Sequence, residues 1–190
     1  IIYIISNNFF ENFSNNNRNI YMYWEGKEYK LIQILRELII LHSKNGKGYN
    51  IHLINNQNLN KYVDKLPKCF DKMKLAHKAD YIRVFVIKKR GGIWLDGDTL
   101  VLDRLDSLFE LIEKKDGFLI KENNKILWNG IFGSKKNTIF MNKWYSDIIK
   151  ILDEKNENID WADLGCTTMD RIYNENPQYL SNYKIFNRLD

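Results

Sequence analysis

The chain contains few cysteines and no long apolar run, and both absences narrow the class of protein it can be. Its two cysteines, Cys69 and Cys166, lack the spacing of metal ligands, so we expect free thiols in a reducing compartment and a cytoplasmic location. No apolar run approaches the roughly 20 residues that a membrane-spanning helix needs, so no transmembrane segment is expected. The opening residues, IIYIIS, are too short and lack the basic residues of a secretion signal, which predicts an edge strand or the remnant of a preceding segment.

The length and composition predict one globular domain over 1–190. Hydrophobic residues make up 44% of the chain and aromatic residues 14%, and the sequence has no internal repeat and no second domain. Because the chain does not begin with methionine, we expect either a trimmed chain or a fragment of a longer one. The net charge of +5 favours phosphate-bearing ligands without requiring a nucleic acid, so no nucleic-acid partner is expected.

Strand-like and helix-like segments alternate along the chain, which predicts an α/β fold. Strands are expected over 20–24, 49–54, 117–121, 126–134 and 183–186, and helices over 27–45, 79–90, 105–113, 138–154 and 163–173. The strand–helix–strand order of the first elements implies a parallel pair with a right-handed crossover. We further expect an Asn-rich linker over 9–19, a continuation of the sheet over 100–102, and an interruption of one strand at Asn129-Gly130.

The stretch 79–102, ADYIRVFVIKKRGGIWLDGDTLVL, combines a helix, a short strand and two carboxylates. Its helix is apolar almost all round, which is typical of a buried helix, yet Asp80 and Arg83 share one face of it. Because an unpaired buried charge is costly, we expect partners for both side chains. Basic residues at 88–90 followed by a Gly-Gly pair predict the end of the helix.

Two aspartates follow the short apolar strand 93–95. Side chains at i and i+2 of a strand point the same way, and with Gly97 between them Asp96 and Asp98 can converge on one hard cation. Carboxylate oxygens suit Mg²⁺ or Mn²⁺, which leave positions open for water and phosphate. Ligands of open α/β sheets bind at the carboxyl ends of strands, so this pair is the candidate metal and ligand site.

The run from 79 to 102 resembles the core of DXD glycosyltransferases of the GT-A fold, such as capsular polysaccharide synthesis proteins, yeast Golgi mannosyltransferases and glucosylating bacterial toxins. Their shared pattern is Ser-Asp-x-x-Arg, a helix, Gly-Gly, an aromatic residue and Leu-Asp-x-Asp. This chain matches the pattern at Asp80, Arg83, Gly91, Gly92, Asp96 and Asp98 and departs from it at Ala79, where the serine usually stands. The resemblance implies a single GT-A domain, a Rossmann-like α/β fold with a mixed, mostly parallel sheet flanked by helices.

The resemblance further implies a metal-dependent hexosyltransferase. The donor is expected to be a nucleotide sugar, UDP-linked rather than GDP-linked, and the acceptor a glycan or glycoprotein, with retention of anomeric configuration. Mn²⁺ or Mg²⁺ would be held by Asp98 directly and by Asp96, which also reaches the ribose, often through water. Asp80 would accept hydrogen bonds from sugar hydroxyls, and Arg83 would donate to the sugar or to a phosphate oxygen.

Further residues take their expected roles from the resemblance. Trp24, at the end of the first core strand, would lie near the nucleotide base, and plain core packing is the alternative. Asn129 would bind a sugar hydroxyl or lie close to the reacting carbon, and a bulge or turn is the alternative. A further metal ligand, often His in such enzymes, would be Asp190 or Asn187, or would lie downstream, because no His follows His77.

Other functions fit parts of the pattern. An EF-hand loop is excluded because its Gly and Glu positions are occupied by Val101 and Ser107. A haloacid-dehalogenase-type phosphatase also places D-x-D after an apolar strand, but Thr99 stands one residue early and that strand normally opens the domain. A non-catalytic module that binds a nucleotide sugar or a glycan stays open, and so does a simple pairing of Asp80 with Arg83 across one helix turn.

Overall fold

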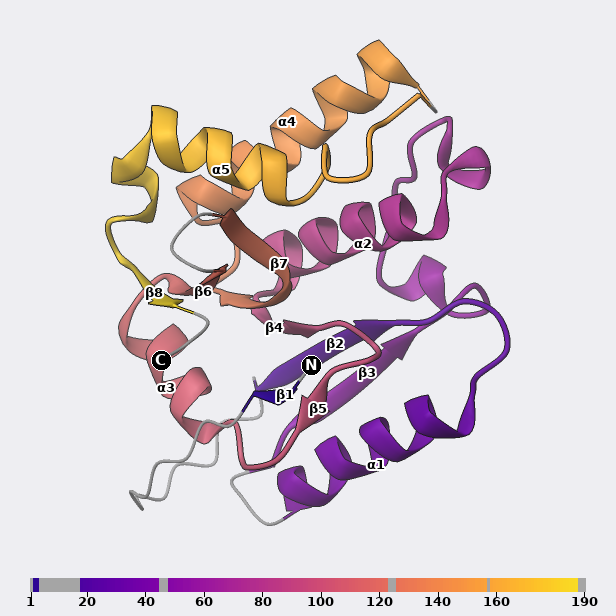
Figure 1. Cartoon of the computed structure of the whole chain (residues 1–190), viewed down its shortest axis with the longest axis vertical. Coiled ribbons are helices and arrows are strands. Elements are labelled where there is room, and N and C mark those ends of the chain that lie inside the picture. Colours follow the sequence, from indigo (N-terminus) through magenta and orange to yellow (C-terminus); the bar gives the residue numbers. More distant parts are fainter. Residues whose placement is uncertain (1, 4–17, 45–47, 123–125, 157, 188–190) are drawn as a thin grey trace.

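A six-stranded sheet lies at the centre of the molecule, and the computed structural model describes residues 2–3, 18–44, 48–122, 126–156 and 158–187 (Figure 1). The strand order is β3 (Asn50–Ile54), β2 (Asn19–Tyr23), β4 (Gly92–Leu95), β7 (Ile126–Ser134), β6 (Gly117–Glu122) and β8 (Tyr183–Asn187). Neighbours are parallel in the β3–β2, β2–β4 and β6–β8 pairs, whereas β7 runs antiparallel to β4 and β6. The expected mixed, mostly parallel α/β sheet is therefore confirmed.

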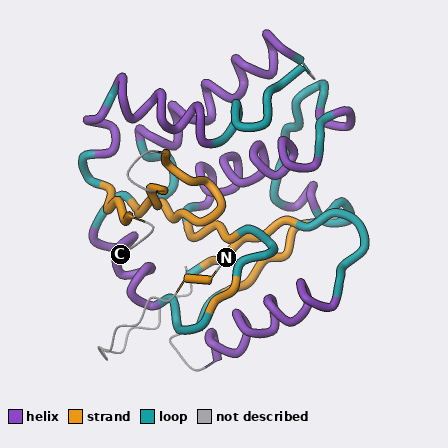
Figure 2. Tube along the Cα trace, in the orientation of Figure 1, coloured by secondary structure: helices purple, strands orange, loops and turns teal. Residues whose placement is uncertain are grey.

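Helices cover both faces of this sheet. The helices α2 (Leu75–Arg90), α4 (Ile139–Lys155) and α5 (Cys166–Glu175) lie over one face, and α1 (Lys30–Lys44) and α3 (Asp106–Lys114) over the other (Figures 1 and 2). Side chains alternate along β2, so Ile20 and Met22 join the core with α1 and α3, while Tyr21 and Tyr23 join the core with α2. Within the described ranges, no helix is both long and apolar enough to cross a bilayer.

The helix α2 is buried, as its apolar sequence predicts, and every residue from 80 to 87 is shielded from solvent. It ends at Gly91, which has φ of +70° and donates its N–H to the carbonyl oxygen of Ile87 at 2.8 Å. Gly92 has φ of +110°, and a Cβ there would lie 2.6 Å from the carbonyl oxygen of Asn19 at the start of β2. The turn into β4 therefore requires glycine, because any side chain would collide with the neighbouring strand.

The strand after the two aspartates does not extend the central sheet, so the prediction for residues 100–102 is wrong. β5 (Leu100–Val101) pairs in parallel with β1 (Ile2–Tyr3) in a separate two-stranded sheet (Figure 1). The central sheet cannot take β5 beside β4, because β2 and β7 already occupy both sides of β4. The chain turns away where β4 ends, and the N–H of Thr99 donates to the carbonyl oxygen of Asp96 at 3.0 Å. β1 confirms the expected N-terminal strand at its two residues, and residues 1 and 4–6 lie outside the described ranges.

The strand β7 is continuous at Asn129-Gly130, so the expected interruption is absent, and an irregularity in its pairing with β6 confirms the alternative of a bulge there. Its pairing with β6 shifts register between Phe118 and Ile120, whereas its pairing with β4 is regular along all 4 residues of that strand. An irregular ladder on one side lets a strand bend while it stays hydrogen-bonded on the other side. The Asn-Gly pair therefore remains beside the end of β4.

Two helices start three residues later than predicted, α1 at Lys30 and α5 at Cys166. Before α5 the chain makes turns instead, and the N–H of Gly165 donates to the carbonyl oxygen of Ala162 at 3.1 Å. These turns extend the connection between α4 and α5 and bring it against β7, where it contacts the candidate site described below.

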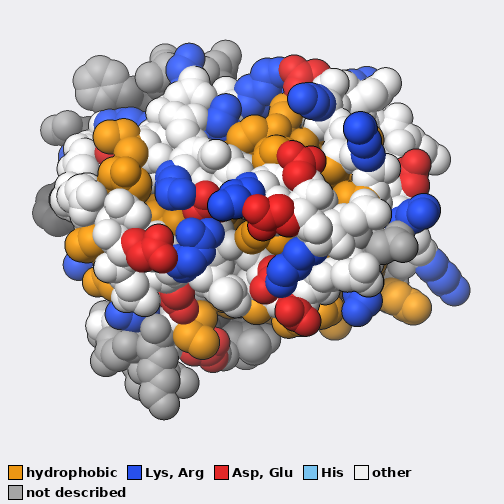
Figure 3. Space-filling view, turned by 90° about the horizontal axis from the view of Figure 1, so that it is seen from above, with side chains coloured by type: hydrophobic (Ala, Val, Ile, Leu, Met, Phe, Trp, Pro, Cys, Tyr) orange, Lys and Arg blue, Asp and Glu red, His pale blue; other side chains and the backbone are white. Residues whose placement is uncertain are grey.

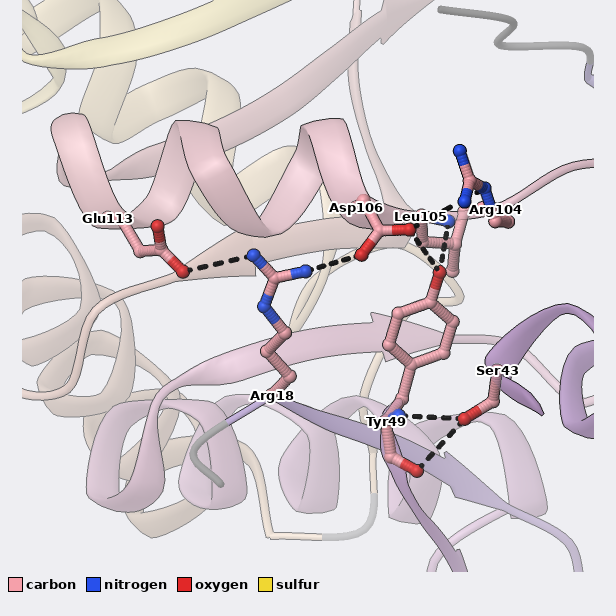
Figure 4. A network of polar contacts seen from close by, with 7 residues as sticks. All are labelled: Arg18, Ser43, Tyr49, Arg104, Leu105, Asp106 and Glu113. Atoms are coloured by element: carbon pink, nitrogen blue, oxygen red, sulfur yellow. Dashed lines mark hydrogen bonds and ion pairs between the residues drawn. The ribbon is translucent and has the colours of Figure 1, made fainter. Parts of the chain in front are cut away.

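Arg18, expected in a linker, is instead a buried anchor at the start of β2 (Figure 4). Its Nη1 lies 2.5 Å from Oδ1 of Asp106 and its Nη2 3.3 Å from Oε1 of Glu113, both on α3. Beside them, the hydroxyl oxygen of Tyr49 accepts the N–H of Leu105 at 2.7 Å. These contacts fasten the starts of β2 and β3 to α3. Asn19, the last residue of the predicted linker, is the first residue of β2, and residues 9–17 lie outside the described ranges.

The surface over α4 and α5 carries interspersed basic and acidic side chains (Figure 3). The groove between these helices is lined by Lys143, Asp147, Lys150, Glu154, Lys155, Asp163 and Arg171, with smaller polar residues between them. Many of these charges neutralise one another: Asp147 has Lys143 at 2.7 Å and Arg171 at 3.0 Å, and Lys155 lies 2.6 Å from Asp163. Because its charges are paired in this way, we do not take the groove as the candidate site.

Candidate active site

The predicted site residues meet at the carboxyl end of β4. The parallel strands β2 and β4 both end at this edge, and the antiparallel β7 places its first half beside them. The N–H of Asp96 donates to the carbonyl oxygen of Gly130 at 2.9 Å, which fixes β7 to the residue that follows β4. Since α2 directly precedes β4 and packs on the sheet, its second and third turns, which carry Asp80 and Arg83, come to the same edge.

Asp80 is a buried carboxylic acid with two partners. It is 6% exposed, and Nδ2 of Asn129 donates to its Oδ1 at 2.7 Å, while Nη2 of Arg83 lies 3.4 Å from the same oxygen. Burial raises the pKa of Asp80 to about 6, against the opposing effects of Arg83 and the Asn129 hydrogen bond, and the charge of Asp96 raises it further. Asp80 therefore changes charge near neutral pH, as groups at functional sites often do.

Arg83 binds both carboxylates rather than Asp80 alone. Its Nη2 lies 3.1 Å from Oδ1 of Asp96, which is closer than its 3.4 Å approach to Asp80. Its Nη1 donates to the carbonyl oxygen of Asn129 at 2.6 Å. The guanidinium also lies over the Trp94 ring, 5.5 Å from the ring centre. Arg83 thus joins α2, β4 and β7, and a simple pair across one helix turn does not describe it.

Asp96 is held through one carboxylate oxygen. Its Oδ1 accepts the indole N–H of Trp94 at 2.8 Å in addition to the contact with Arg83. Its side chain is 31% exposed, and in the described part of the chain no hydrogen bond or ion pair reaches Oδ2. Burial raises the pKa of Asp96. The charge of Arg83 and the hydrogen bond from Trp94 lower this pKa, and the charge of Asp98 raises it. One oxygen of Asp96 is thus fixed by the protein, and the other is open to a ligand.

The turn between the two aspartates packs against Trp24. A Cβ at Gly97 would lie 2.9 Å from Cε3 of the Trp24 ring, so glycine lets the ring approach the turn. The Trp24 indole N–H donates to the carbonyl oxygen of Lys27 at 3.2 Å, which fixes the ring. Asp98, the residue after Gly97, is exposed. The structure therefore brings Trp24 to the aspartates, and its contact with a nucleotide base stays a prediction.

Asn129 makes contacts that the sequence did not reveal. Besides holding Asp80, it meets the turn before α5: a Cβ at Gly165 would lie 2.2 Å from Nδ2 of Asn129. The thiol of Cys166 donates to Oδ1 of Asn129, with the sulfur 3.6 Å away. The sequence alone indicated only a free thiol at Cys166. No local pattern links either residue to a strand 37 residues earlier.

The Asp96–Asp98 pair is the part of the site that could hold a divalent cation. Proteins commonly bind Mg²⁺ through one or two carboxylates together with water and substrate phosphates, and carboxylates also suit Mn²⁺. One open oxygen on Asp96 and an exposed Asp98 fit that requirement. The described ranges contain no group of three or more His, Cys, Asp or Glu side chains that could hold a metal ion. Asp190, the expected third ligand, lies outside the described residues, so its role stays a prediction.

The fold matches solved glycosyltransferase structures. One, titled "PaToxG Glycosyltransferase", has 16% identity and a TM-score of 0.64, with 85% of this chain and 70% of that chain covered. Another is a glycosyltransferase involved in the glycosylation of the major capsid of PBCV-1, with 15% identity and a TM-score of 0.55, covering 89% and 81% of the two chains. Comparison with curated protein sequences found no match. The fold class is therefore that of GT-A-like glycosyltransferases.

The family is shown by the sequence itself. A profile of the capsular polysaccharide synthesis protein family matches residues 3–187, which is nearly the whole chain. The chain belongs to this family. Family and fold together confirm the expected assignment to the glycosyltransferases, an enzyme class.

Proposed function

We propose that this glycosyltransferase moves a sugar from a nucleotide-sugar donor, UDP-linked rather than GDP-linked, to a glycan or glycoprotein acceptor in a metal-dependent reaction. One observation carries the proposal. Two carboxylates, that of the exposed Asp98 and that of Asp96 with its unbound Oδ2, lie next to a buried polar group. This group consists of Asp80, Arg83 and Asn129. The pair suits a cation with phosphates, and the buried group suits sugar hydroxyls.

The pair Asp96 and Asp98 would hold Mn²⁺ or Mg²⁺, with Asp190 as a third ligand. Bound there, the cation would supply positive charge to the diphosphate that leaves when the bond to the sugar breaks. Asp96 would present its open Oδ2, because Trp94 and Arg83 keep Oδ1 turned inward. Asp98 is free to turn toward a ligand, since its side chain is exposed.

Asp80 and Asn129 would bind the transferred sugar. A carboxylic acid with a pKa of about 6 can accept from a sugar hydroxyl when ionised and donate to one when protonated. Arg83 keeps both carboxylates and the Asn129 carbonyl in place, and its predicted contact with the sugar or a phosphate would require one of its donors to turn outward. Trp24 would lie against the base, next to the turn that carries the aspartates.

Retention of anomeric configuration and the nature of the acceptor are the finer parts of this proposal. Retention is taken from the resembled families. The similar structure that acts in capsid glycosylation supports a protein-linked glycan as one acceptor class, and the family description supports a polysaccharide as another.

The proposal is tested by donor cleavage. The chain is incubated with UDP-glucose, UDP-galactose, UDP-N-acetylglucosamine and GDP-mannose, with Mn²⁺, Mg²⁺ or a chelator, and release of UDP or GDP is measured. We expect release from at least one UDP-sugar only with the cation, and a loss of about 100-fold or more in D98A. The control D153A removes an exposed carboxylate from α4 and should retain the activity.

Two other outcomes would overturn the proposal. Metal-dependent binding of a nucleotide sugar without UDP release, in the presence of candidate acceptors, would indicate a non-catalytic binding module. Phosphate release from phosphomonoesters that depends on the first aspartate, Asp96, would indicate a haloacid-dehalogenase-type phosphatase.

A further inference from the structure

The connection that precedes α5 touches Asn129, the β7 side chain that donates to Asp80. Gly165 leaves the space that the Asn129 amide occupies, and the Cys166 thiol donates to the amide oxygen. We propose that Gly165 and Cys166 are positioning residues, which hold the Asn129 side chain in the orientation that donates to Asp80. Their effect on sugar transfer rests on the proposed function, whereas the contact itself does not.

The two ends of the Asn129 amide have partners of opposite kinds. Nδ2 can only donate, and it faces Oδ1 of Asp80 at 2.7 Å; Oδ1 can only accept, and it faces the thiol of Cys166 at 3.6 Å. Burial raises the pKa of the Cys166 thiol, so the S–H donor is retained at neutral pH. Rotating the amide by 180° would place two acceptors against each other at the ionised Asp80, and would leave Nδ2 facing a thiol sulfur that accepts only weakly. Both contacts therefore select the same orientation.

The turn that presents Gly165 and Cys166 is itself firmly anchored. The indole N–H of Trp144 on α4 donates to the carbonyl oxygen of Leu164 at 2.8 Å, and both residues are fully buried. On the other side, Oδ1 of Asp170 on α5 accepts the N–H of Leu127 on β7 at 2.8 Å. The turn is thus fixed to α4 and to the same strand that carries Asn129, which is what a positioning element requires.

The space beside position 165 admits no side chain. A Cβ would lie 2.2 Å from Nδ2 and 3.0 Å from Cγ of Asn129, which is too close for any contact. Asn129 cannot move away freely, because Arg83 holds its carbonyl oxygen at 2.6 Å and the strand is paired with β4. A side chain at 165 would therefore turn the amide away from Asp80.

The proposal is tested first without any ligand, by NMR of the ¹⁵N-labelled chain. The side-chain NH₂ signals of Asn129 are assigned by their loss in N129A. We expect these signals to shift or broaden in G165A and C166A and to remain near their original positions in C166S, which keeps a hydrogen-bond donor. The control T167A changes the next, exposed residue of α5 and should leave them unchanged.

Unchanged Asn129 signals in both G165A and C166A would overturn the proposal. Where G165A does not fold, C166A decides alone, because removing a thiol leaves the backbone unstrained. These NMR signals also keep the test separate from the proposed function. If the Asn129 signals move as expected but no nucleotide sugar binds the wild-type chain, the proposal that Gly165 and Cys166 position Asn129 holds and the transferase proposal fails.

Kinetics with a UDP-sugar that the wild type cleaves, in the presence of Mn²⁺, then measure the consequence. We expect C166A to lower kcat about fivefold with little change in KM, which corresponds to the ~1 kcal/mol that a neutral hydrogen bond contributes. C166S should recover most of that loss. A decrease in C166A that C166S does not recover, with the Asn129 signals in place, would contradict a positioning role.

Discussion

Nη2 of Arg83 lies 3.1 Å from Oδ1 of Asp96, so an arginine on α2 holds the carboxylate that ends β4. The same nitrogen lies 3.4 Å from Asp80, and the opposite nitrogen binds the backbone of β7. A buried cation between two carboxylates offsets a repulsion that would otherwise separate them. The site is therefore assembled around Arg83 before any ligand binds.

Replacing Arg83 should unfold the chain more easily. R83M leaves Asp80 and Asp96 without their cation, and breaking a buried pair in this way costs about 3 kcal/mol or more. The measurement is the free energy of unfolding in urea at pH 7. The control R36M removes the ion pair with Glu28, whose side chains are each 24% exposed, and should cost below about 1 kcal/mol. Equal losses in the two variants would contradict the assigned role of Arg83.

The stability of the chain should depend on pH through Asp80. Its pKa is about 6 in the folded chain, against an ordinary value of 3.8 for an exposed aspartate, as in the unfolded chain. The folded state therefore binds the proton more tightly than the unfolded state. Stability is then highest below pH 4 with respect to this group and falls as pH rises to about 7, by roughly 3 kcal/mol.

The variant D80N cannot ionise at this position and should lack that fall. The difference in unfolding free energy between D80N and the wild type should therefore grow between pH 4 and pH 7. The exposed variant D153N serves as the control for loss of one carboxylate. Parallel pH profiles for D80N and the wild type would show that Asp80 is not held in a destabilising environment.

Gly97 should matter for ligand binding through Trp24. G97A places a methyl group 2.9 Å from the ring of Trp24, which must then move. We expect about fivefold weaker binding of UDP with Mn²⁺, measured by calorimetry, because a displaced aromatic contact loses about 1 kcal/mol. In a W24A background the same change should have little further effect, since the contact is already gone. If the losses of UDP affinity in G97A and W24A add in full in the double variant, Gly97 does not act through Trp24.

Arg18 should affect stability without affecting the site. It fastens the start of β2 to Asp106 and Glu113 on α3, at the end of β2 that lies away from the aspartates. We expect R18M to lower the unfolding free energy by about 2 kcal/mol, because Asp106, whose side chain is 17% exposed, loses its nearest cation. Its affinity for UDP and Mn²⁺, measured below the unfolding temperature, should match the wild type. A large loss of affinity for UDP and Mn²⁺ would contradict this expectation, because it would mean that the ion pairs of Arg18 affect the geometry of the site.

Local rules predicted the central part of the fold. An apolar run with basic residues before Gly-Gly predicts where α2 ends, because those residues act on the neighbouring backbone. The placement of Asp96 and Asp98 after β4 follows in the same way from a short apolar strand. The sheet order could not be predicted like this, and β5 was misplaced because both edges of β4 are taken by strands distant in sequence.

The partners within the site required the folded chain. The requirement that Asp80 and Arg83 have partners was predicted from burial, but their identity was not. Asn129, which donates to Asp80, lies 49 residues further on; the Asn-Gly pair indicated an irregular strand there, but no local pattern indicated this partner. Cys166 has no local signal at all, because its role depends on how the turn before α5 packs on β7.

The position of the bound cation tests the central claim most directly. Mn²⁺ broadens NMR signals of nearby nuclei, so a titration of the ¹⁵N-labelled chain with Mn²⁺ and UDP maps where the ion lies. We predict that the backbone signals of residues 96–98 and of Trp24 broaden first, and that D98A abolishes this effect. Broadening centred on the acidic side chains between α4 and α5 (Figure 3), with residues 96–98 unaffected, would contradict the account.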